Sequence, residues 1–179
     1  MRLPAPAGTT LVRSAVKISV VVGNPKPRSR TYEIAHELAR HLAAVTGADQ
    51  LHSVDLAEHA ADLFTWPHDG LAELNAQVAA SDYLVVASPT YKATYTGLLK
   101  AFFDRYPNNA LAGVTAVPVM TASAPEHAMA VEVFLRPLLV ELGASVPARG
   151  LAFCMTQMGE MHEIVAAWAA ANLAGRRLA

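Results

Sequence analysis

One short stretch of the chain, GNPKPRSRT at residues 23–31, has the composition of a phosphate-binding loop. It combines cationic side chains with hydroxyl groups: Lys26, Arg28, Arg30, Ser29 and Thr31. A helix is expected to begin near Ser29, and the free N–H groups at a helix start attract anions. Gly23 permits the tight turn that leads into such a loop. The stretch therefore predicts a site for a phosphate monoester, although a simple helix cap beside solvated cations would explain the same residues.

A second stretch, SPTYKATYTG at residues 88–97, carries two tyrosines, a lysine and several hydroxyl groups. Such residues can line an aromatic ligand, with Lys92 and main-chain N–H groups bonding to the polar atoms of a heterocycle. We expect Tyr91, which lies beside Pro89 at a strand tip, to contact such a ligand. Thr96 is better explained as the cap of the following helix. Neither stretch has the GxGxxG or GxxxxGK[ST] pattern of other nucleotide-binding loops.

The surrounding sequence alternates short apolar runs with helical periods. Strands are predicted at residues 16–22, 50–55, 83–87, 114–120 and 145–153. Helices are predicted at residues 29–46, 71–80, 97–106, 126–142 and 159–178. This alternation predicts an α/β fold with a doubly wound parallel sheet. Ligands bind such sheets beyond the carboxyl ends of the strands, so the loops at residues 23–31, 88–96 and 121–127 should form the site.

Two prolines interrupt the predicted elements. Pro118 lies inside the fourth strand, where it removes a backbone donor from the ladder. Pro137 lies inside the fourth helix, so we expect a kink or break near Phe134.

Composition narrows the class of protein. The 179 residues are 53% hydrophobic and 16% charged, which fits a single densely packed domain over residues 16–179. The formal net charge of −1 offers no basic field, so we expect binding to neither nucleic acid nor a membrane. Residues 1–15 resemble a flexible leader, either a tail or an oligomer arm. The single cysteine, Cys154, and the absence of a signal-like start favour the cytoplasm.

No metal site or nucleophilic triad is predicted. His36 and His41 lie five residues apart, a spacing that does not place both on one helix face as metal ligands require. No Ser, His and Asp arrangement for nucleophilic catalysis can be recognised. We therefore name no metal ligand and no catalytic residue.

The chain from about Lys17 onward resembles the NADPH-dependent FMN reductase family, and within it the flavin reductases of bacterial two-component sulfonate monooxygenase systems. The resemblance rests on three segments in order: GNPKPRSRT, SPTYKATYTGLLKAFFD and HAMAVEVFLRPLL. It implies a flavodoxin-like α/β fold, a doubly wound five-stranded parallel sheet in the order 2-1-3-4-5 with helices on both faces. The excess of apolar Phe, Leu and Met residues fits a homo-oligomer, which we expect to be a homodimer or homotetramer.

The resemblance further implies which residues bind the flavin. The phosphate would be held from the first loop: Gly23, Lys26, Ser29 and Thr31. The isoalloxazine ring would be bordered from the second: Pro89, Thr90, Tyr91 and Lys92. The loop at residues 121–124 would close over the ring edge: Thr121, Ala122 and Ser123. The sequence departs from the family at Asn24, where a serine is usual, and at residues 121–124, where TASA replaces a glycine-bearing turn. Val133 also occupies the position of a tyrosine that the sulfonate-linked members carry at an inserted turn tied to the tetramer interface.

The implied activity is hydride transfer from NADPH or NADH to FMN, with the reduced flavin passing to a partner monooxygenase. The flavin carries this chemistry, so no general base is needed. Two alternatives stay open at this stage. One is a reductase with tightly bound FMN that acts on quinones, azo dyes or metal oxyanions. The other is a flavodoxin-type electron carrier, although a net charge of −1 lacks the acidic surface expected for docking.

Overall fold

The computed structural model describes residues 15–173, which form one five-stranded sheet in the order β2-β1-β3-β4-β5 with every neighbouring pair parallel. The strands are β1 (Lys17–Val22), β2 (Gln50–Asp55), β3 (Tyr83–Pro89), β4 (Thr115–Ala122) and β5 (Leu151–Cys154). Strand order reverses between β1 and β3, as the predicted flavodoxin-like topology requires. The predicted fold class is confirmed.

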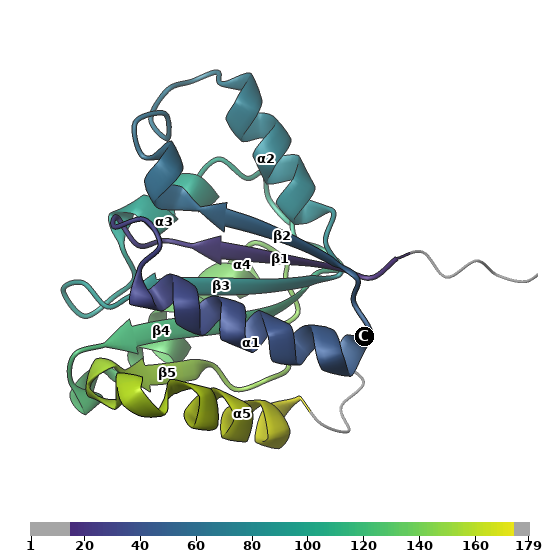
Figure 1. Cartoon of the computed structure of the whole chain (residues 1–179). Coiled ribbons are helices and arrows are strands. Elements are labelled where there is room, and N and C mark those ends of the chain that lie inside the picture. Colours follow the sequence, from purple (N-terminus) through teal and green to yellow (C-terminus); the bar gives the residue numbers. More distant parts are fainter. Residues whose placement is uncertain (1–14, 174–179) are drawn as a thin grey trace, which may run out of the picture.

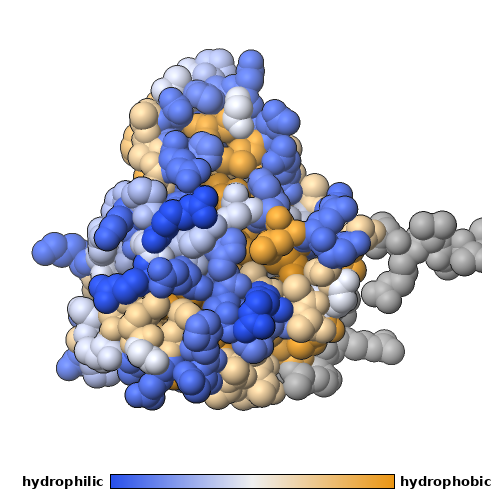
Figure 2. All heavy atoms as spheres, viewed as in Figure 1, coloured by the Kyte–Doolittle hydropathy of each residue, from blue (hydrophilic) through white to orange (hydrophobic). Residues whose placement is uncertain are grey.

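Helices cover both faces of the sheet (Figure 1). One face carries α1 (Arg30–Thr46) and α5 (Met161–Asn172). The other carries α2 (Asp69–Ala79), α3 (Gly97–Phe103) and α4 (Arg136–Glu141). Polar side chains dominate the outer surface of the α1 and α5 side, with apolar patches between them (Figure 2).

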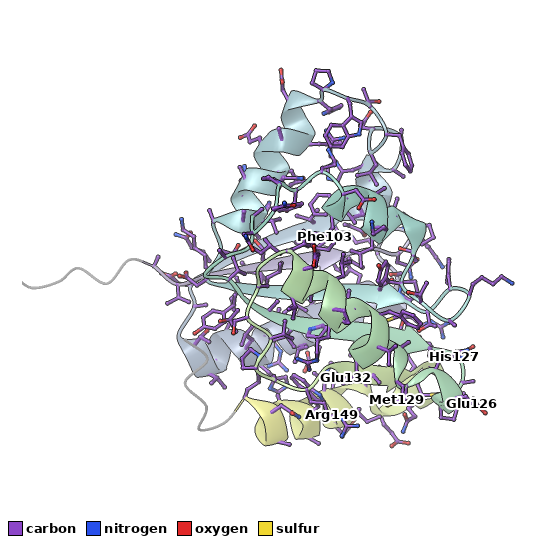
Figure 3. All side chains as sticks on the ribbon, turned by 180° about the vertical axis from the view of Figure 1, so that it is seen from behind. Phe103, Glu126, His127, Met129, Glu132 and Arg149 are labelled. Carbon is purple, nitrogen blue, oxygen red and sulfur yellow. The ribbon has the colours of Figure 1, made fainter. Side chains whose placement is uncertain are left out.

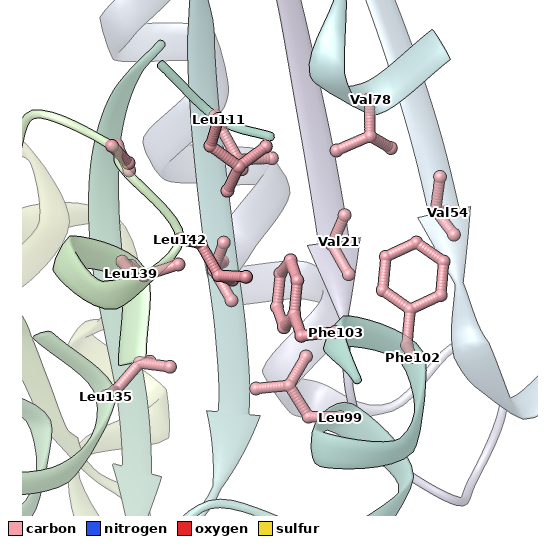
Figure 4. Close-up of a cluster of buried hydrophobic side chains, with 14 of the residues drawn as sticks. Val21, Val54, Val78, Leu99, Phe102, Phe103, Leu111, Leu135, Leu139 and Leu142 are labelled. Atoms are coloured by element: carbon pink, nitrogen blue, oxygen red, sulfur yellow. The ribbon is translucent and has the colours of Figure 1, made fainter. Parts of the chain in front are cut away.

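Each face has its own buried apolar layer, because successive strand side chains point to opposite sides. Val20 and Val22 face α1 and α5, whereas Val21 faces the other layer. Figure 4 shows that second layer, in which Phe102 and Phe103 of α3 pack against the sheet. Cover on both faces explains the continuous apolar runs of β1 and β3.

Helix α1 illustrates how the sequence builds these layers. Its residues Ile34, Leu38 and Leu42 recur every four positions, and all three are fully buried. Ser29 caps its start, and Gly47 ends it with a φ of 72°, a left-handed conformation that glycine adopts without strain.

The fourth helix is broken where Pro137 predicted a break. A 3-10 turn at Pro125–His127 precedes a π-helical turn at Val131–Leu135, and α4 follows. The N–H of Arg136 donates to the carbonyl of Val131, five residues back, which widens the helix ahead of the proline. The irregularity expected near Phe134 is therefore confirmed, whereas the helix begins at Ala130 rather than at residue 126.

The predicted strand at residues 145–153 is also shorter than expected. Only Leu151–Cys154 forms β5, and Ser145 makes an isolated bridge to Thr115. The backbone between Ser145 and β5 is bound instead by two side chains of the fourth helix, Arg136 and Glu132. Arg136 donates to the carbonyls of Val146 and Ala148, at 2.5 and 2.7 Å.

Glu132 completes this contact by accepting from the N–H of Gly150 at 2.7 Å, and it pairs with Arg136. Figure 3 shows Glu132 in this part of the molecule, with Arg149 in the segment that follows α4. The pKa of Glu132 is lowered, chiefly by its hydrogen bond to Arg136. Side chains therefore replace the strand ladder over residues 146–150.

The gap in pairing between β4 and the chain before β5 explains why a proline is tolerated at position 118. Ala116 donates its N–H to Ser145, so the nitrogen of Pro118, two residues on, points to the same side of β4. Because β5 begins only opposite Val119, no strand pairs with β4 on that side at Pro118. The missing donor therefore costs no ladder bond.

The remaining differences are at element ends. Helix α3 stops at Phe103 rather than residue 106, and a 3-10 turn at Met155–Glu160 precedes α5. The predicted leader lies outside the described residues apart from Ala15, as does the predicted end of the last helix beyond Leu173. No helix within residues 15–173 is long and apolar enough to cross a membrane.

Candidate functional site

The loops beyond the carboxyl ends of the strands enclose a hollow of about 260 Å³. Its lining comes from the loops after β1, β3, β4 and β5: Asn24, Arg30, Thr31, Pro89, Thr90, Tyr91, Thr121, Ser123 and Met155. These segments meet because all the strands are parallel and end at one edge. The lining is rich in hydroxyl groups and has one cationic side chain.

The loop between β1 and α1 is fixed by its own polar groups. The Asn24 side-chain carbonyl accepts the N–H of Lys26 at 2.9 Å, and its amide donates to Thr31 Oγ1 at 3.2 Å. The N–H of Arg28 donates to Asp55 at 2.8 Å, which ties the loop to the end of β2. Arg28 has a φ of 49°, a conformation that costs a non-glycine residue energy.

The start of α1 faces this hollow. Ser29 is the N-cap, and its hydroxyl accepts the N–H of Tyr32 at 3.3 Å. The N–H groups of Arg30 and Thr31 come earlier in the helix and have no partner within it. They leave a positive end of the helix open to an anion.

The three cations of this loop point in different directions. Arg30 lines the hollow. Arg28 instead packs over the Tyr32 ring, 5.1 Å from its centroid, on the outer surface of α1. Lys26 is exposed and does not line the hollow. The cation nearest to an anion at the helix start is therefore Arg30.

The loop between β3 and α3 projects from the same edge. Tyr91 and Thr94 pair across a two-residue turn, with the Tyr91 N–H donating to the Thr94 carbonyl at 2.8 Å. The two residues inside the turn, Lys92 and Ala93, have φ values of 51° and 72°. Positive φ at both central positions is the geometry of a type I′ turn, which normally selects asparagine and glycine. The Tyr91 side chain is half exposed.

Thr96 closes this loop as the predicted cap of α3. Its hydroxyl accepts the N–H of Leu99 at 3.1 Å and donates to the Gly23 carbonyl at 2.5 Å. A side chain at Gly23 would meet Leu99, since an added Cβ would lie 2.5 Å from the Leu99 Cβ. The two loops thus touch directly, and Gly23 provides the space.

Three threonines meet at the hollow: Thr31 from the start of α1, Thr90 from the loop after β3 and Thr121 from the end of β4. Thr31 and Thr121 are both buried, and their hydroxyl oxygens lie 2.9 Å apart. The N–H of Thr90 donates to the Thr121 carbonyl at 2.7 Å. The Thr90 hydroxyl is buried without a hydrogen-bond partner among the described residues. That unpaired hydroxyl is available to a polar atom of a ligand.

Six residues from the predicted site line the hollow: Thr31, Pro89, Thr90, Tyr91, Thr121 and Ser123. Others lie behind it or outside it: Gly23, Lys26, Ser29, Lys92 and Ala122. Thr121 and Ala122 also belong to β4, which runs two residues further than predicted.

Three lining residues are absent from the predicted site: Asn24, Arg30 and Met155. The position of Arg30 as the first residue of α1 was the signal that could have identified it. Met155 follows β5, and the loop after the fifth strand was not among the three loops expected to form the site.

Cys154 and the bend after β4 lie next to the hollow. The thiol of Cys154 contacts the hydroxyl of Thr156 at 3.1 Å, and this contact lowers the pKa of Cys154. Figure 3 shows Glu126 and His127 at the tip of the bend, beyond the end of β4. Within residues 15–173 no cluster of His, Cys, Asp and Glu could hold a metal ion.

A sheet of this order, with a helix start and hydroxyl-rich loops at its reversal point, defines a flavodoxin-like protein built to bind a phosphorylated ligand. The family model described as NADPH-dependent FMN reductase matches residues 16–157. The chain therefore belongs to the NADPH-dependent FMN reductase family, and it is an oxidoreductase that uses FMN with NAD(P)H.

Curated relatives agree with this assignment. The chain is 30% identical over 157 residues to an NADH-dependent FMN reductase SfnF of Pseudomonas putida, covering 85% of this chain and 84% of that protein. It is 32% identical over 130 residues to an FMN reductase (NADPH) of Pseudomonas aeruginosa, covering 70% and 69%.

Solved structures show the same architecture. The apo form of the NADH:FMN oxidoreductase EMOB superposes with a TM-score of 0.76 at 26% identity, covering 91% of this chain and 92% of that one. An oxidoreductase of Corynebacterium diphtheriae superposes with a TM-score of 0.78 at 29% identity, covering 87% and 93%.

Proposed function

We propose that the hollow at the carboxyl edge of the sheet is the FMN site, with the phosphate at the start of α1 and the isoalloxazine ring toward the Tyr91 loop. The observation that carries this proposal is the helix start, where two N–H groups, two threonines and Arg30 surround one small space. A phosphate dianion matches this combination of donors and positive charge.

The residues present fit the rest of the cofactor. The buried, unpaired hydroxyl of Thr90 can bond to a polar atom beyond the phosphate. Pro89 and Tyr91 offer flat apolar surface for an aromatic ring, and Ser123 and Met155 also line the hollow. When bound, FMN supplies the two-electron chemistry, so the protein needs to position the two rings rather than to supply a base.

We propose that the reduced flavin serves a partner enzyme, such as a flavin-dependent monooxygenase. The open ring end supports this, because half-exposed Tyr91 and exposed Lys92 leave a route for a flavin to enter and leave. Among the relatives, SfnF is called NADH-dependent and the Pseudomonas aeruginosa enzyme is called NADPH-dependent. The single cysteine, Cys154, fits a reducing compartment, so we place the enzyme in the cytoplasm.

Stopped-flow oxidation of NADPH and NADH tests this function. The protein's bound flavin is first measured, and turnover is then followed with and without added FMN. We expect turnover that rises with added free FMN and needs no other acceptor. A yellow protein that turns over only with a quinone would replace the proposal with a tightly bound quinone reductase. No flavin binding at micromolar concentration would contradict the site itself.

We also propose that the fourth helix forms a contact between copies of the chain. Large apolar side chains are exposed around its π-helical turn: Met129, Val133, Phe134 and Val140. The turn spans Val131–Leu135, with Val133 at its centre. Exposed apolar residues grouped on one element are typical of a protein interface.

Sedimentation of the wild-type protein and of the double variant Val133→Asp with Phe134→Asp tests this contact. We expect the wild type to be a dimer or tetramer and the variant to have a smaller mass. The control is Val45→Asp, an exposed apolar residue near the end of α1, which should leave the mass unchanged. A variant with the wild-type mass would contradict this interface.

A further inference from the structure

We infer that Thr121 is a positioning residue for the flavin phosphate, which it serves through Thr31, and that it helps the enzyme to choose FMN over riboflavin. This inference rests on the FMN site proposed above. It assigns Thr121 to the phosphate end of that site, whereas the sequence placed it at the ring edge.

The geometry begins with the two hydroxyl groups. Thr31 Oγ1 and Thr121 Oγ1 lie 2.9 Å apart, and both residues are about 2% exposed. Asn24 Nδ2 donates to Thr31 Oγ1 at 3.2 Å. The orientation of that amide is fixed, because its other atom, Oδ1, accepts the N–H of Lys26.

The number of bonds each hydroxyl can make then decides the direction of the protons. A threonine hydroxyl has one proton to donate and two lone pairs that accept. Asn24 already fills one lone pair of Thr31. If Thr31 donated its proton to Thr121, it would have no proton left for a phosphate oxygen.

Thr31 can donate to a phosphate only if Thr121 donates to Thr31. The oxygen of Thr31 then accepts from both Asn24 and Thr121 while its proton points to the phosphate. Charge-assisted bonds strengthen when the donor is itself held by further hydrogen bonds. Thr121 therefore orients the Thr31 hydroxyl without touching the phosphate.

Thr121 also reaches the other end of the site through its backbone. Its carbonyl accepts the N–H of Thr90, and it pairs in register with Pro89. A valine at position 121 keeps this backbone bond and the side-chain shape while removing the hydroxyl. The variant Thr121→Val thus isolates the hydroxyl's role.

The experiment measures dissociation constants for FMN and for riboflavin by quenching of flavin fluorescence. We expect Thr121→Val to weaken FMN binding about tenfold and riboflavin binding less than about twofold, since riboflavin lacks the phosphate. Thr121→Ser should bind FMN within about twofold of the wild type, because it keeps the hydroxyl.

Two controls accompany this series. Thr46→Val removes a hydroxyl at the far end of α1, where it donates to the Leu42 carbonyl, and should change neither affinity. Thr31→Val combined with Thr121→Val should bind FMN no more weakly than Thr31→Val alone, because Thr121 acts through Thr31.

The outcomes separate this inference from the proposed function. Equal losses of FMN and riboflavin in Thr121→Val would overturn it and place the hydroxyl at the ring or the ribityl chain. Wild-type affinity for FMN in that variant would also overturn it. A wild-type protein that binds FMN and riboflavin equally would overturn the proposed phosphate site, and the inference with it. A folded Thr121→Ser that fails to restore FMN affinity would contradict the role of the hydroxyl.

Discussion

The two ends of the candidate site differ in how the protein holds them. At the phosphate end, Asn24, Ser29 and Thr31 are fixed by side-chain hydrogen bonds, and Asp55 secures the loop from β2. At the ring end, Tyr91 stands on a projecting turn whose central residues have positive φ. One end is organised before a ligand arrives, and the other is exposed.

This difference suggests how one site can select a flavin and still release it. A rigid phosphate end provides recognition, because its donors lose little entropy when the ligand binds. With the flavin placed as proposed, an exposed ring end would leave the reacting face open to nicotinamide and to exchange of the flavin. The following four changes test the contrast, from the largest expected effect to the smallest.

The phosphate end should dominate the affinity for FMN. Replacing both Ser29 and Thr31 with alanine should weaken FMN binding by about 3 kcal/mol, since a bond from Thr31 to a charged group contributes roughly 1.5 to 3 kcal/mol and Ser29 caps the helix start that faces the anion. Isothermal titration with FMN measures this loss. Tyr91→Ala is the matched variant at the ring end, and we expect a smaller loss. Unchanged affinity in the double variant would reduce residues 23–31 to a capping loop.

The contact between the two ends should be sensitive to volume at Gly23. A methyl group there would collide with Leu99, so Gly23→Ala should lower the free energy of unfolding by about 1 to 3 kcal/mol. Chemical denaturation measures the change. Gly97→Ala is the control, because an added Cβ at Gly97 meets no atom within 4 Å. If both substitutions have equal effects, close packing at Gly23 is not the cause.

At the ring end, relieving the strain in the turn at Lys92 and Ala93 should stabilise the fold without changing the affinity for FMN. Ala93 has a φ of 72°, so Ala93→Gly should raise the free energy of unfolding by about 1 kcal/mol. The affinity for FMN should stay close to that of the wild type. Ala128→Gly, at a φ of −59°, should instead destabilise the protein. Destabilisation by Ala93→Gly would show that the turn is not strained.

The smallest effect concerns the contact between α1, which begins at the phosphate end, and α5. Glu37 of α1 lies within 3.2 Å of His162 of α5 and pairs with Arg40. Its hydrogen bond to Arg40, followed by that to His162, lowers the pKa of Glu37 to about 2 against an opposing effect of burial. A carboxylate with a lowered pKa stabilises the fold above its ordinary pKa near 4.5, and this contribution disappears as the pH falls toward 2.

Glu37→Gln should therefore lower the melting temperature at pH 7 and have a smaller effect near pH 2. We expect about 1 kcal/mol or less at pH 7, in keeping with partly exposed ion pairs. Differential scanning calorimetry at the two pH values measures this. An effect that is equal at both values would show that the charge of Glu37 is not responsible.

The strand order came from the family resemblance, whereas the residue pattern predicted a doubly wound parallel sheet, the helix at residues 29–46 and the meeting of three loops. These depend on local patterns, such as the four-residue period of Ile34, Leu38 and Leu42. The misplaced strand at residues 145–153 depends on a non-local cause, the binding of its backbone by Arg136 and Glu132. No local pattern reveals such a contact.

The candidate site shows the same division. The loops and most lining residues could be predicted, because parallel strands bring their carboxyl ends together. The directions of Arg28 and Arg30 could not, because they depend on the rotation of α1 and on the Tyr32 ring. The partnership of Thr31 with Thr121, ninety positions apart, also appears only in the folded chain.

The side chains of Glu132 and Arg136 also fix the length of a connection. They lie one helical turn apart and bind backbone groups spread over residues 146–150. Insertion of even one residue there would shift these groups out of reach, so this connection should reject changes of length. Arg105 binds the carbonyls of Leu63 and Thr65 at 3.0 Å in the same manner, so the connection before α2 should also be sensitive to a change of length.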